Sequence, residues 1–122
     1  MKTKPLSPTL RERKRYLVYE VISESDIGDV YRISDSIKNS MKSYIGEKDL
    51  GKAGLYFLNH KFNRKLNRGI VRVENNHIDN LRSSLALVEK IDEDPVIVRS
   101  VGVSGILKKA EEKFLFFQAK AA

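Results

Sequence analysis

Two kinds of hydrophobic spacing alternate along the chain and predict four strands and three helices. Runs rich in β-branched and aromatic residues, typical of strands, occupy residues 16–23, 55–62, 69–74 and 96–103. Elsewhere apolar residues recur every three or four positions, which indicates one face of a helix. The three predicted helical faces are Val30, Ile33, Ile37, Met41 and Tyr44; Ile78, Leu81, Leu85 and Val88; and Leu107, Ala110, Phe114 and Phe117.

Residues with capping and turn preferences indicate where these elements begin and end. Residues 26–29 can cap the first helix, and Gly46 can end it. Asn75 and Asn76 are placed to cap the second helix. The polar, basic residues 63–68 predict a hairpin turn between the second and third strands, and residues 92–95 predict another turn.

The order strand-helix-strand-strand-helix-strand, followed by a helix, predicts an α+β fold of the ferredoxin-like type, which RNA-recognition motifs (RRMs) share. This fold has a four-stranded antiparallel sheet with two helices on one face. The first strand is apolar at both alternating sets of positions, and such a strand is normally covered on both sides. We therefore expect the C-terminal helix on or near the second face. Residues 16–122 would form a single RRM-like domain, preceded by a basic N-terminal arm, residues 1–15.

Composition excludes several functional classes. The 122 residues suggest one domain, and 41% hydrophobic with 32% charged residues indicate a globular chain. The chain has no cysteine, which excludes disulfides, thiolate metal sites and cysteine nucleophiles. The basic N-terminus is not followed by the apolar core of a signal peptide, and no apolar run reaches the length of a membrane span. We expect a cytoplasmic protein with no membrane partner.

The positive charge is confined to two short segments. Residues 1–15 contain six basic side chains and one acidic, and residues 61–72 contain five basic and none acidic, whereas the rest of the chain is slightly acidic. Such clusters suit a polyanionic partner, because each phosphate that they neutralise releases counterions. The two clusters therefore favour nucleic-acid binding over the alternative, a solvated basic surface that only aids solubility.

The third predicted strand lacks the aromatic residues on which an RRM stacks bases. Arg68 and Gly69 keep the start of that signature, but Ile70 stands at the first aromatic position. RNA binding would then depend on backbone charge and shape rather than on an open sheet of aromatic side chains. Ser104, where the last strand meets a helix, could contact a phosphate, although capping that helix is the simpler interpretation.

Signals of catalysis are poor. The two histidines, His60 and His77, fall in a predicted strand and at a helix start, where a structural or solvent-exposed role is the simpler interpretation. The acidic residues are scattered and form no motif of a metalloprotease, a nucleotide-binding loop or a hydrolase. We assign no catalytic residue and no metal ligand to the polypeptide.

Several segments, in order along the chain, resemble archaeal ribonuclease P protein component 2. They are Leu6-Ser7-Pro8-Thr9-Leu10-Arg11, Arg13-Lys14-Arg15-Tyr16-Leu17, Gly69-Ile70-Val71-Arg72-Val73, Leu81-Arg82-Ser83-Ser84-Leu85 and Arg99-Ser100-Val101-Gly102-Val103-Ser104-Gly105. The resemblance covers roughly residues 4–110. The chain departs from the family at Ser7, where a second proline is usual, and at Ile106, where a threonine is common.

The resemblance implies a protein subunit of ribonuclease P, the ribonucleoprotein endonuclease that removes 5′ leaders from precursor tRNA. The RNA would carry catalysis with Mg²⁺ in its active site, and the protein would bind no cofactor. The implied partners are the ribonuclease P RNA, precursor tRNA, protein component 3, other ribonuclease P proteins and a second copy of the chain. Charge and motif position together assign RNA binding to Lys4, Arg11, Arg13, Lys14, Arg15, Lys61, Arg64, Lys65, Arg68, Arg72, Arg82 and Ser104.

The apolar residues of the C-terminal helix exceed one stripe, so we expect this helix to meet a protein partner as well as the sheet. The partner-interface residues would be Leu107, Phe114, Leu115, Phe116 and Phe117. Two other functions stay open from the residues alone. One is a ferredoxin-like dimerisation or assembly module that does not bind RNA. The other is a metal-dependent nuclease that acts alone, which would require the purified protein to cleave RNA without an RNA cofactor.

Overall fold

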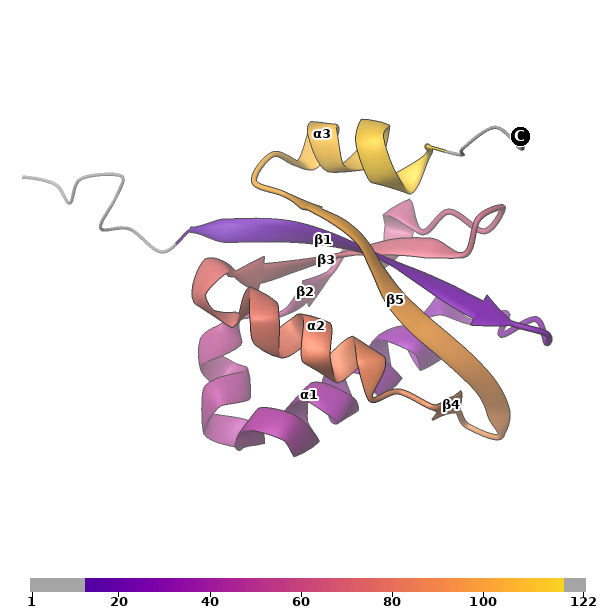
Figure 1. Cartoon of the computed structure of the whole chain (residues 1–122), viewed down its shortest axis with the longest axis horizontal. Coiled ribbons are helices and arrows are strands. Elements are labelled where there is room, and N and C mark those ends of the chain that lie inside the picture. Colours follow the sequence, from indigo (N-terminus) through magenta and orange to yellow (C-terminus); the bar gives the residue numbers. More distant parts are fainter. Residues whose placement is uncertain (1–12, 118–122) are drawn as a thin grey trace, which may run out of the picture.

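The computed structural model describes residues 13–117, which form an α+β fold in three layers (Figure 1). A curled antiparallel sheet lies between helices α1 and α2 on one face and helix α3 on the other. No helix in the described residues is both long and apolar enough to cross a membrane. The elements are β1 Lys14–Ser23, α1 Val30–Ala53, β2 Tyr56–Phe57, β3 Arg68–Glu74, α2 Ile78–Ala86, β4 Lys90–Ile91, β5 Asp94–Ser104 and α3 Leu107–Ala110, with 3-10 turns at Asn59–Lys61 and Asn75–His77 and a π-helical turn at Glu111–Leu115.

The sheet has the order β2-β3-β1-β5-β4, so β1 lies at its centre. β1 pairs with β3 from Lys14 to Glu20 and with β5 from Tyr16 to Ser23, in both cases antiparallel. β1, the strand that was predicted to be covered on both sides, therefore pairs with a neighbour on each edge, and β3 lies between β1 and the short edge strand β2.

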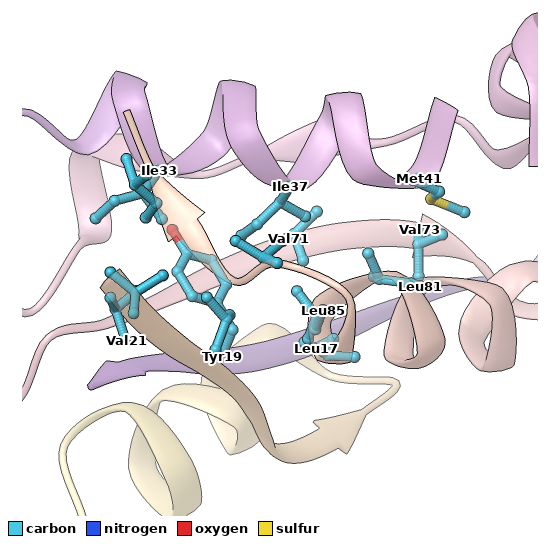
Figure 2. Packing of buried hydrophobic residues seen from close by; sticks show 14 of the residues in the cluster. Leu17, Tyr19, Val21, Ile33, Ile37, Met41, Val71, Val73, Leu81 and Leu85 are labelled. Atoms are coloured by element: carbon cyan, nitrogen blue, oxygen red, sulfur yellow. The ribbon is translucent and has the colours of Figure 1, made fainter. Parts of the chain in front are cut away.

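The main core lies between the sheet and the two longer helices (Figure 2). Alternate residues of β1 and β3 point to this face and are fully or almost fully buried. Residues spaced three or four apart on α1 and α2 meet them, as the sequence periodicity predicts. The labelled core side chains are Leu17, Tyr19, Val21, Ile33, Ile37, Met41, Val71, Val73, Leu81 and Leu85. Tyr44, which the sequence also assigned to this face, is exposed.

A second core lies on the opposite face of the sheet, under α3. Val18 of β1 and Ile70 of β3 pack there against Ala110 and Leu115, all four buried. The expectation that the C-terminal helix covers the second face is thus confirmed. A close approach makes it possible, because the ring of Phe114 occupies the space that a Cβ atom would need at Gly102 on β5.

The prediction of four strands is wrong, because the sheet has a fifth. Lys90 and Ile91 form β4, which pairs with the first two residues of β5 through a tight turn. The turn has Asp92 with φ of 54°, a left-handed conformation that aspartate tolerates better than most residues. The turn was predicted from its composition, but two strand residues are too few for an alternating pattern to reveal them.

The second predicted strand, residues 55–62, is also shorter than expected. Only Tyr56 and Phe57 pair with β3, and the chain then closes a 3-10 turn through hydrogen bonds from Lys61 N to Leu58 O and from Phe62 N to Asn59 O. The apolar residues of this segment therefore do not share one strand face, and Leu58 and Phe62 pack in different cores.

Glycines set the helical boundaries of α1. Gly46, with φ of 86° and ψ of 165°, is non-helical and ends the first helical segment as predicted; a second segment follows across this kink to Ala53, and Gly54 closes it in a left-handed conformation. Asp29 caps α1 as predicted, its side chain accepting a hydrogen bond from Tyr31 N. Neither asparagine caps α2, which differs from the expectation: its N-cap residue is His77, without a side-chain hydrogen bond, and Glu74 caps the preceding 3-10 turn by accepting from Asn76 N.

The stripe predicted for the C-terminal helix is wrong in its second half. Phe117 is exposed, whereas Leu115 is fully buried. The reason is the π-helical turn at Glu111–Leu115, in which Phe116 N donates to Glu111 O, five residues earlier. One extra residue per turn places Leu115 on the same face as Ala110, which a 3.6-residue periodicity cannot predict.

Candidate nucleic-acid interface

The first basic segment ends at one end of β1. Lys14 lies opposite Glu74 on β3, and the guanidinium of Arg15 lies against Gly105, just after β5. Arg13 is exposed, and its backbone oxygen accepts a hydrogen bond from Asn75 N, which fixes the start of the strand. The described basic residues of the arm are therefore held at the end of the central strand. Lys4 and Arg11 lie outside the described residues.

Most charged groups of the second basic segment, residues 61–72, contact the chain itself. Lys61 Nζ lies 2.6 Å from Glu111 Oε1, and Arg64 Nη1 donates to Gly28 O at 2.6 Å. Lys65 is exposed. Sequence reasoning treated this cluster as one RNA-binding surface, but in the structure several of its members join the loop before β3 to the loop before α1 and to the C-terminal helical turns.

Arg68 has the most extensive set of internal contacts. Its Nε donates to Glu20 Oε2 at 2.8 Å, and its Nη1 donates to the backbone oxygens of Phe114 and Phe117. Both side chains of the ion pair are largely buried. Arg68 thus caps the C-terminal end of the last helical turn, and Glu20 neutralises its charge within the fold.

Glu20 joins two arginines on neighbouring strands. It lies directly opposite Arg68 on β3 and Arg99 on β5, and Arg99 Nε donates to Glu20 Oε1 at 2.8 Å. Burial by itself raises the pKa of Glu20, but the hydrogen bonds and charges of Arg99 and Arg68 outweigh it and hold that pKa below its ordinary value. Sequence reasoning missed this triad, because its members meet only through the strand register.

Arg72 differs from Arg68 although both belong to β3. Its guanidinium carbon lies 4.9 Å from the ring centroid of Tyr56 on β2, a cation–π contact. Its Nε is buried without a hydrogen-bond acceptor. Within residues 13–117, Arg72 makes no ion pair, so its charge is not neutralised by the described part of the chain.

The two other predicted RNA-binding residues lie apart from each other. Ser104 Oγ accepts a hydrogen bond from Ile106 N at 3.1 Å in the turn before α3. It does not cap that helix, because the N-cap residue is Ile106 and no side chain caps it. Arg82 is exposed on α2, on the face of the sheet opposite α3. The structure therefore brings residues 13–15 of the first basic segment, Ser104 and Arg72 to one end of the sheet, but it does not bring Arg82 there.

The predicted partner-interface residues divide by exposure. Phe116 and Phe117 are exposed by 61% and 59%, Leu107 and Phe114 are partly buried against the second core, and Leu115 has no exposed surface in this conformation. Ile22 and Ile97, directly paired on β1 and β5, add further exposed apolar surface. Neither of these isoleucines was singled out from the sequence.

Comparison with known families decides what kind of chain carries this arrangement. The model of the Rpp14/Pop5 family matches residues 15–115, nearly the whole of the described part. The chain belongs to the Rpp14/Pop5 family. The match begins at Arg15, the second residue of β1, and ends at Leu115 in the second core, so it covers the elements of the fold except for Lys14.

Curated relatives support this membership. Ribonuclease P protein component 2 of Pyrococcus furiosus is 37% identical over 112 residues, which are 92% of this chain and 91% of that protein. The protein of the same name from Methanococcus vannielii is 36% identical, over 92% of this chain and 82% of the relative. The resemblance stated from the sequence segments is confirmed.

A solved structure also shares the fold of this Rpp14/Pop5 chain. A chain in the cryo-EM structure of yeast ribonuclease MRP superposes with a TM-score of 0.62 at 19% identity, over 88% of this chain and 94% of that one. At this identity the likeness concerns the fold. Among residues 13–117 of the Rpp14/Pop5 chain, no three His, Cys, Asp or Glu side chains are grouped to hold a metal ion.

Proposed function

We propose that this chain is a protein subunit of ribonuclease P, which binds the catalytic RNA and supports removal of 5′ leaders from precursor tRNA. The observation that carries the proposal is membership in the Rpp14/Pop5 family together with 33–37% identity, over most of both chains, to relatives named ribonuclease P protein component 2. The basic segment at the start of β1 and the unpaired Arg72 supply the cationic surface that such a role needs.

The sheet would act as an RRM-like scaffold, with the ferredoxin-like order β2-β3-β1-β5 and β4 added at one edge. RNA would contact the N-terminal arm and the end of β1, where Arg13 and Arg15 lie. Lys61, Arg64 and Arg68 would contribute less to RNA binding than the sequence alone suggests, because their charged groups already bind acceptors within the chain.

A protein partner would cover the exposed apolar residues. Ile22, Ile97, Phe116 and Phe117 are each about half exposed or more, and apolar side chains of this size are a common sign of protein contact. By the family resemblance, the partner would be ribonuclease P protein component 3, with two copies of this chain in the assembly. Cytoplasmic localisation belongs to the same proposal.

The polypeptide would take no direct part in bond cleavage. Phosphodiester hydrolysis needs an activated water and stabilisation of charge on the phosphate, which Mg²⁺ ions in the RNA would supply. The chain would act on RNA folding and substrate affinity, so added magnesium would partly replace it. This assignment rests on the resemblance and on the scattered acidic residues of the sequence.

The test is precursor tRNA processing by the reconstituted complex, with and without this chain, over a range of magnesium concentrations. We expect omission of the chain to lower the rate at low magnesium and to matter less at high magnesium. The dimerisation-module alternative instead expects that omission leaves the rate unchanged at every magnesium concentration. Cleavage of precursor tRNA by the purified chain without RNA would contradict both.

A further inference from the structure

Four side chains from four strands lie in one row across the sheet. Tyr56 on β2 is the register partner of Arg72 on β3, which is the partner of Tyr16 on β1, which is the partner of Ser104 on β5. Residues directly opposite in adjacent strands project from the same face. The row therefore lies on one face of the sheet and spans it from the edge strand to β5.

This face is the one that α3 covers in part. Val71 and Val73, which flank Arg72 in β3, belong to the core under α1 and α2, so Arg72 points to the other face. Tyr16 packs at the border of the core under α3. Tyr56, at the edge, is 54% exposed. The row thus begins beside α3 and becomes open towards β2.

The open end of the row is a stack of two flat groups. The Arg72 guanidinium lies over the Tyr56 ring, and its Nε is buried with no acceptor. A buried donor without an acceptor costs free energy. No hydrogen bond or ion pair in the described residues therefore holds Arg72 in its position on the ring. Arg68 and Arg99, on the same face, both bind Glu20. Within the described residues, Arg72 is left with a charge that only the aromatic ring contacts.

A ligand that fits this stack needs a flat, electron-rich surface and negative charge close by. An unpaired nucleotide has both, since bases stack on tyrosine rings and on arginine guanidinium planes, and each base carries a phosphate beside it. A fully paired helix does not fit, because its bases are already stacked on one another. Arg13, exposed just before β1 and three residues from Tyr16, adds basic charge near this end of the sheet.

We propose that the Tyr56–Arg72 stack is a binding site for one unpaired RNA nucleotide, with the base stacked on the pair and the outer N–H groups of Arg72 donating to its phosphate. The inference rests on the proposed RNA-binding function and adds a contact to it. It differs from the expectation that this chain recognises RNA without any aromatic stacking. The aromatic ring comes from the edge strand β2, and not from the β3 positions of the RRM signature.

The experiment measures binding of the full-length chain to ribonuclease P RNA, to single-stranded oligoadenylate of about ten nucleotides, and to a duplex of equal length. The variants are Tyr56→Ala, Tyr56→Phe and Arg72→Lys. Tyr44→Ala is the matched control, because Tyr44 is a similarly exposed tyrosine on α1, outside the row. Circular dichroism and melting curves establish that each variant is folded, and Arg72→Lys keeps the test available if Tyr56→Ala is not.

Tyr56→Ala is expected to weaken binding of the single strand by about tenfold or more, with the duplex changed much less. Tyr56→Phe keeps the ring and should bind nearly as the unchanged chain does. Arg72→Lys keeps the charge but loses the flat guanidinium, so it should weaken single-strand binding at an unchanged salt dependence. Tyr44→Ala should have no effect. Ultraviolet crosslinking should join the single strand to the peptide that contains Tyr56.

Several results would overturn the inference. Tyr56→Ala and Arg72→Lys could bind the single strand as tightly as the unchanged chain does. The two variants could weaken binding of the single strand and of the duplex equally. The unchanged chain could also show no preference for the single strand. In either case the site would bind phosphate only. They could bind RNA normally and lose a protein partner. In all these cases the unchanged chain still binds ribonuclease P RNA. If the unchanged chain did not bind this RNA, the proposed function itself would be rejected.

Discussion

Arg68 and Arg72 belong to the same strand and the same basic segment, but their neighbours give them different roles. Arg68 is enclosed by Glu20 and by the carbonyl groups at the end of the last helical turn, whereas Arg72 contacts a ring. Charge counting along the sequence cannot distinguish the two, because the difference comes from the partner that the register places opposite each residue.

Replacing Arg68 by Met is expected to destabilise the chain by about 2–4 kcal/mol, since it leaves a largely buried carboxylate with one partner fewer and removes the cap of the last helical turn. The matched control is Arg99→Met. Arg99 binds the same carboxylate but is more than half exposed, so about 1 kcal/mol or less is expected. Urea unfolding measures both, and equal losses would contradict the special role of Arg68.

The triad also predicts a pH dependence of stability. The folded pKa of Glu20 is below its unfolded value, because the hydrogen bonds of Arg99 and Arg68 outweigh the effect of burial. Its stabilising contribution is therefore fully present above the unfolded pKa, which is about 4.3, and is lost as the pH falls through the folded pKa. Below about pH 5 the unchanged chain should lose stability more steeply than Glu20→Gln. Parallel curves of unfolding free energy against pH would show that Glu20 is not the group responsible.

At the scale of elements, the C-terminal helix depends on a close approach to β5. A methyl group at Gly102 would overlap the Phe114 ring, so Gly102→Ala should cost about 1–3 kcal/mol. The control is Gly51→Ala in α1, where no atom lies within 4 Å of the added carbon and where alanine is the better helix former by up to about 1 kcal/mol. In a double-mutant cycle with Phe114→Ala the penalty at Gly102 should disappear. A penalty that persists without the ring would place the obstacle elsewhere.

The sequence predicted the elements that repeat a pattern and missed those that break one. Apolar residues at both alternating sets of positions in β1 were enough to predict helices on each face of the sheet, as the two cores confirm. The two-residue strand β4 is too short to show alternation. The π-helical turn adds one residue to a helical turn and so places Leu115 on the buried face, which a regular 3.6-residue periodicity cannot predict.

At the scale of the whole molecule, the sequence located the positive charge but not its availability. Both basic segments were evident from counting, yet Lys61, Arg64 and Arg68 bind acceptors within the fold. The stack of Arg72 on Tyr56 could not be predicted, because it joins residues sixteen positions apart through the β2–β3 register. The described part of the first basic segment, residues 13–15, lies at the start of β1.

The first basic segment should carry a large share of the electrostatic binding. Changing Arg11, Arg13, Lys14 and Arg15 together to alanine is expected to weaken binding to ribonuclease P RNA and to lower the slope of log affinity against log salt by roughly three to four contacts' worth. Lys108→Ala with Lys109→Ala, two exposed lysines of α3, is the control for general loss of charge. Titrations at several salt concentrations measure the slope. An unchanged slope would mean that RNA does not contact this segment.

The central claim is that this chain works as part of ribonuclease P, and the most direct measurement is the identity of its RNA in the cell. The full-length chain, carrying an affinity tag, is recovered from native lysate at low salt, and the bound RNA is sequenced beside that of an equally basic control protein. We predict that ribonuclease P RNA is the most enriched species and that precursor tRNA accompanies it. Recovery of the folded chain with no RNA enriched over the control would contradict the account.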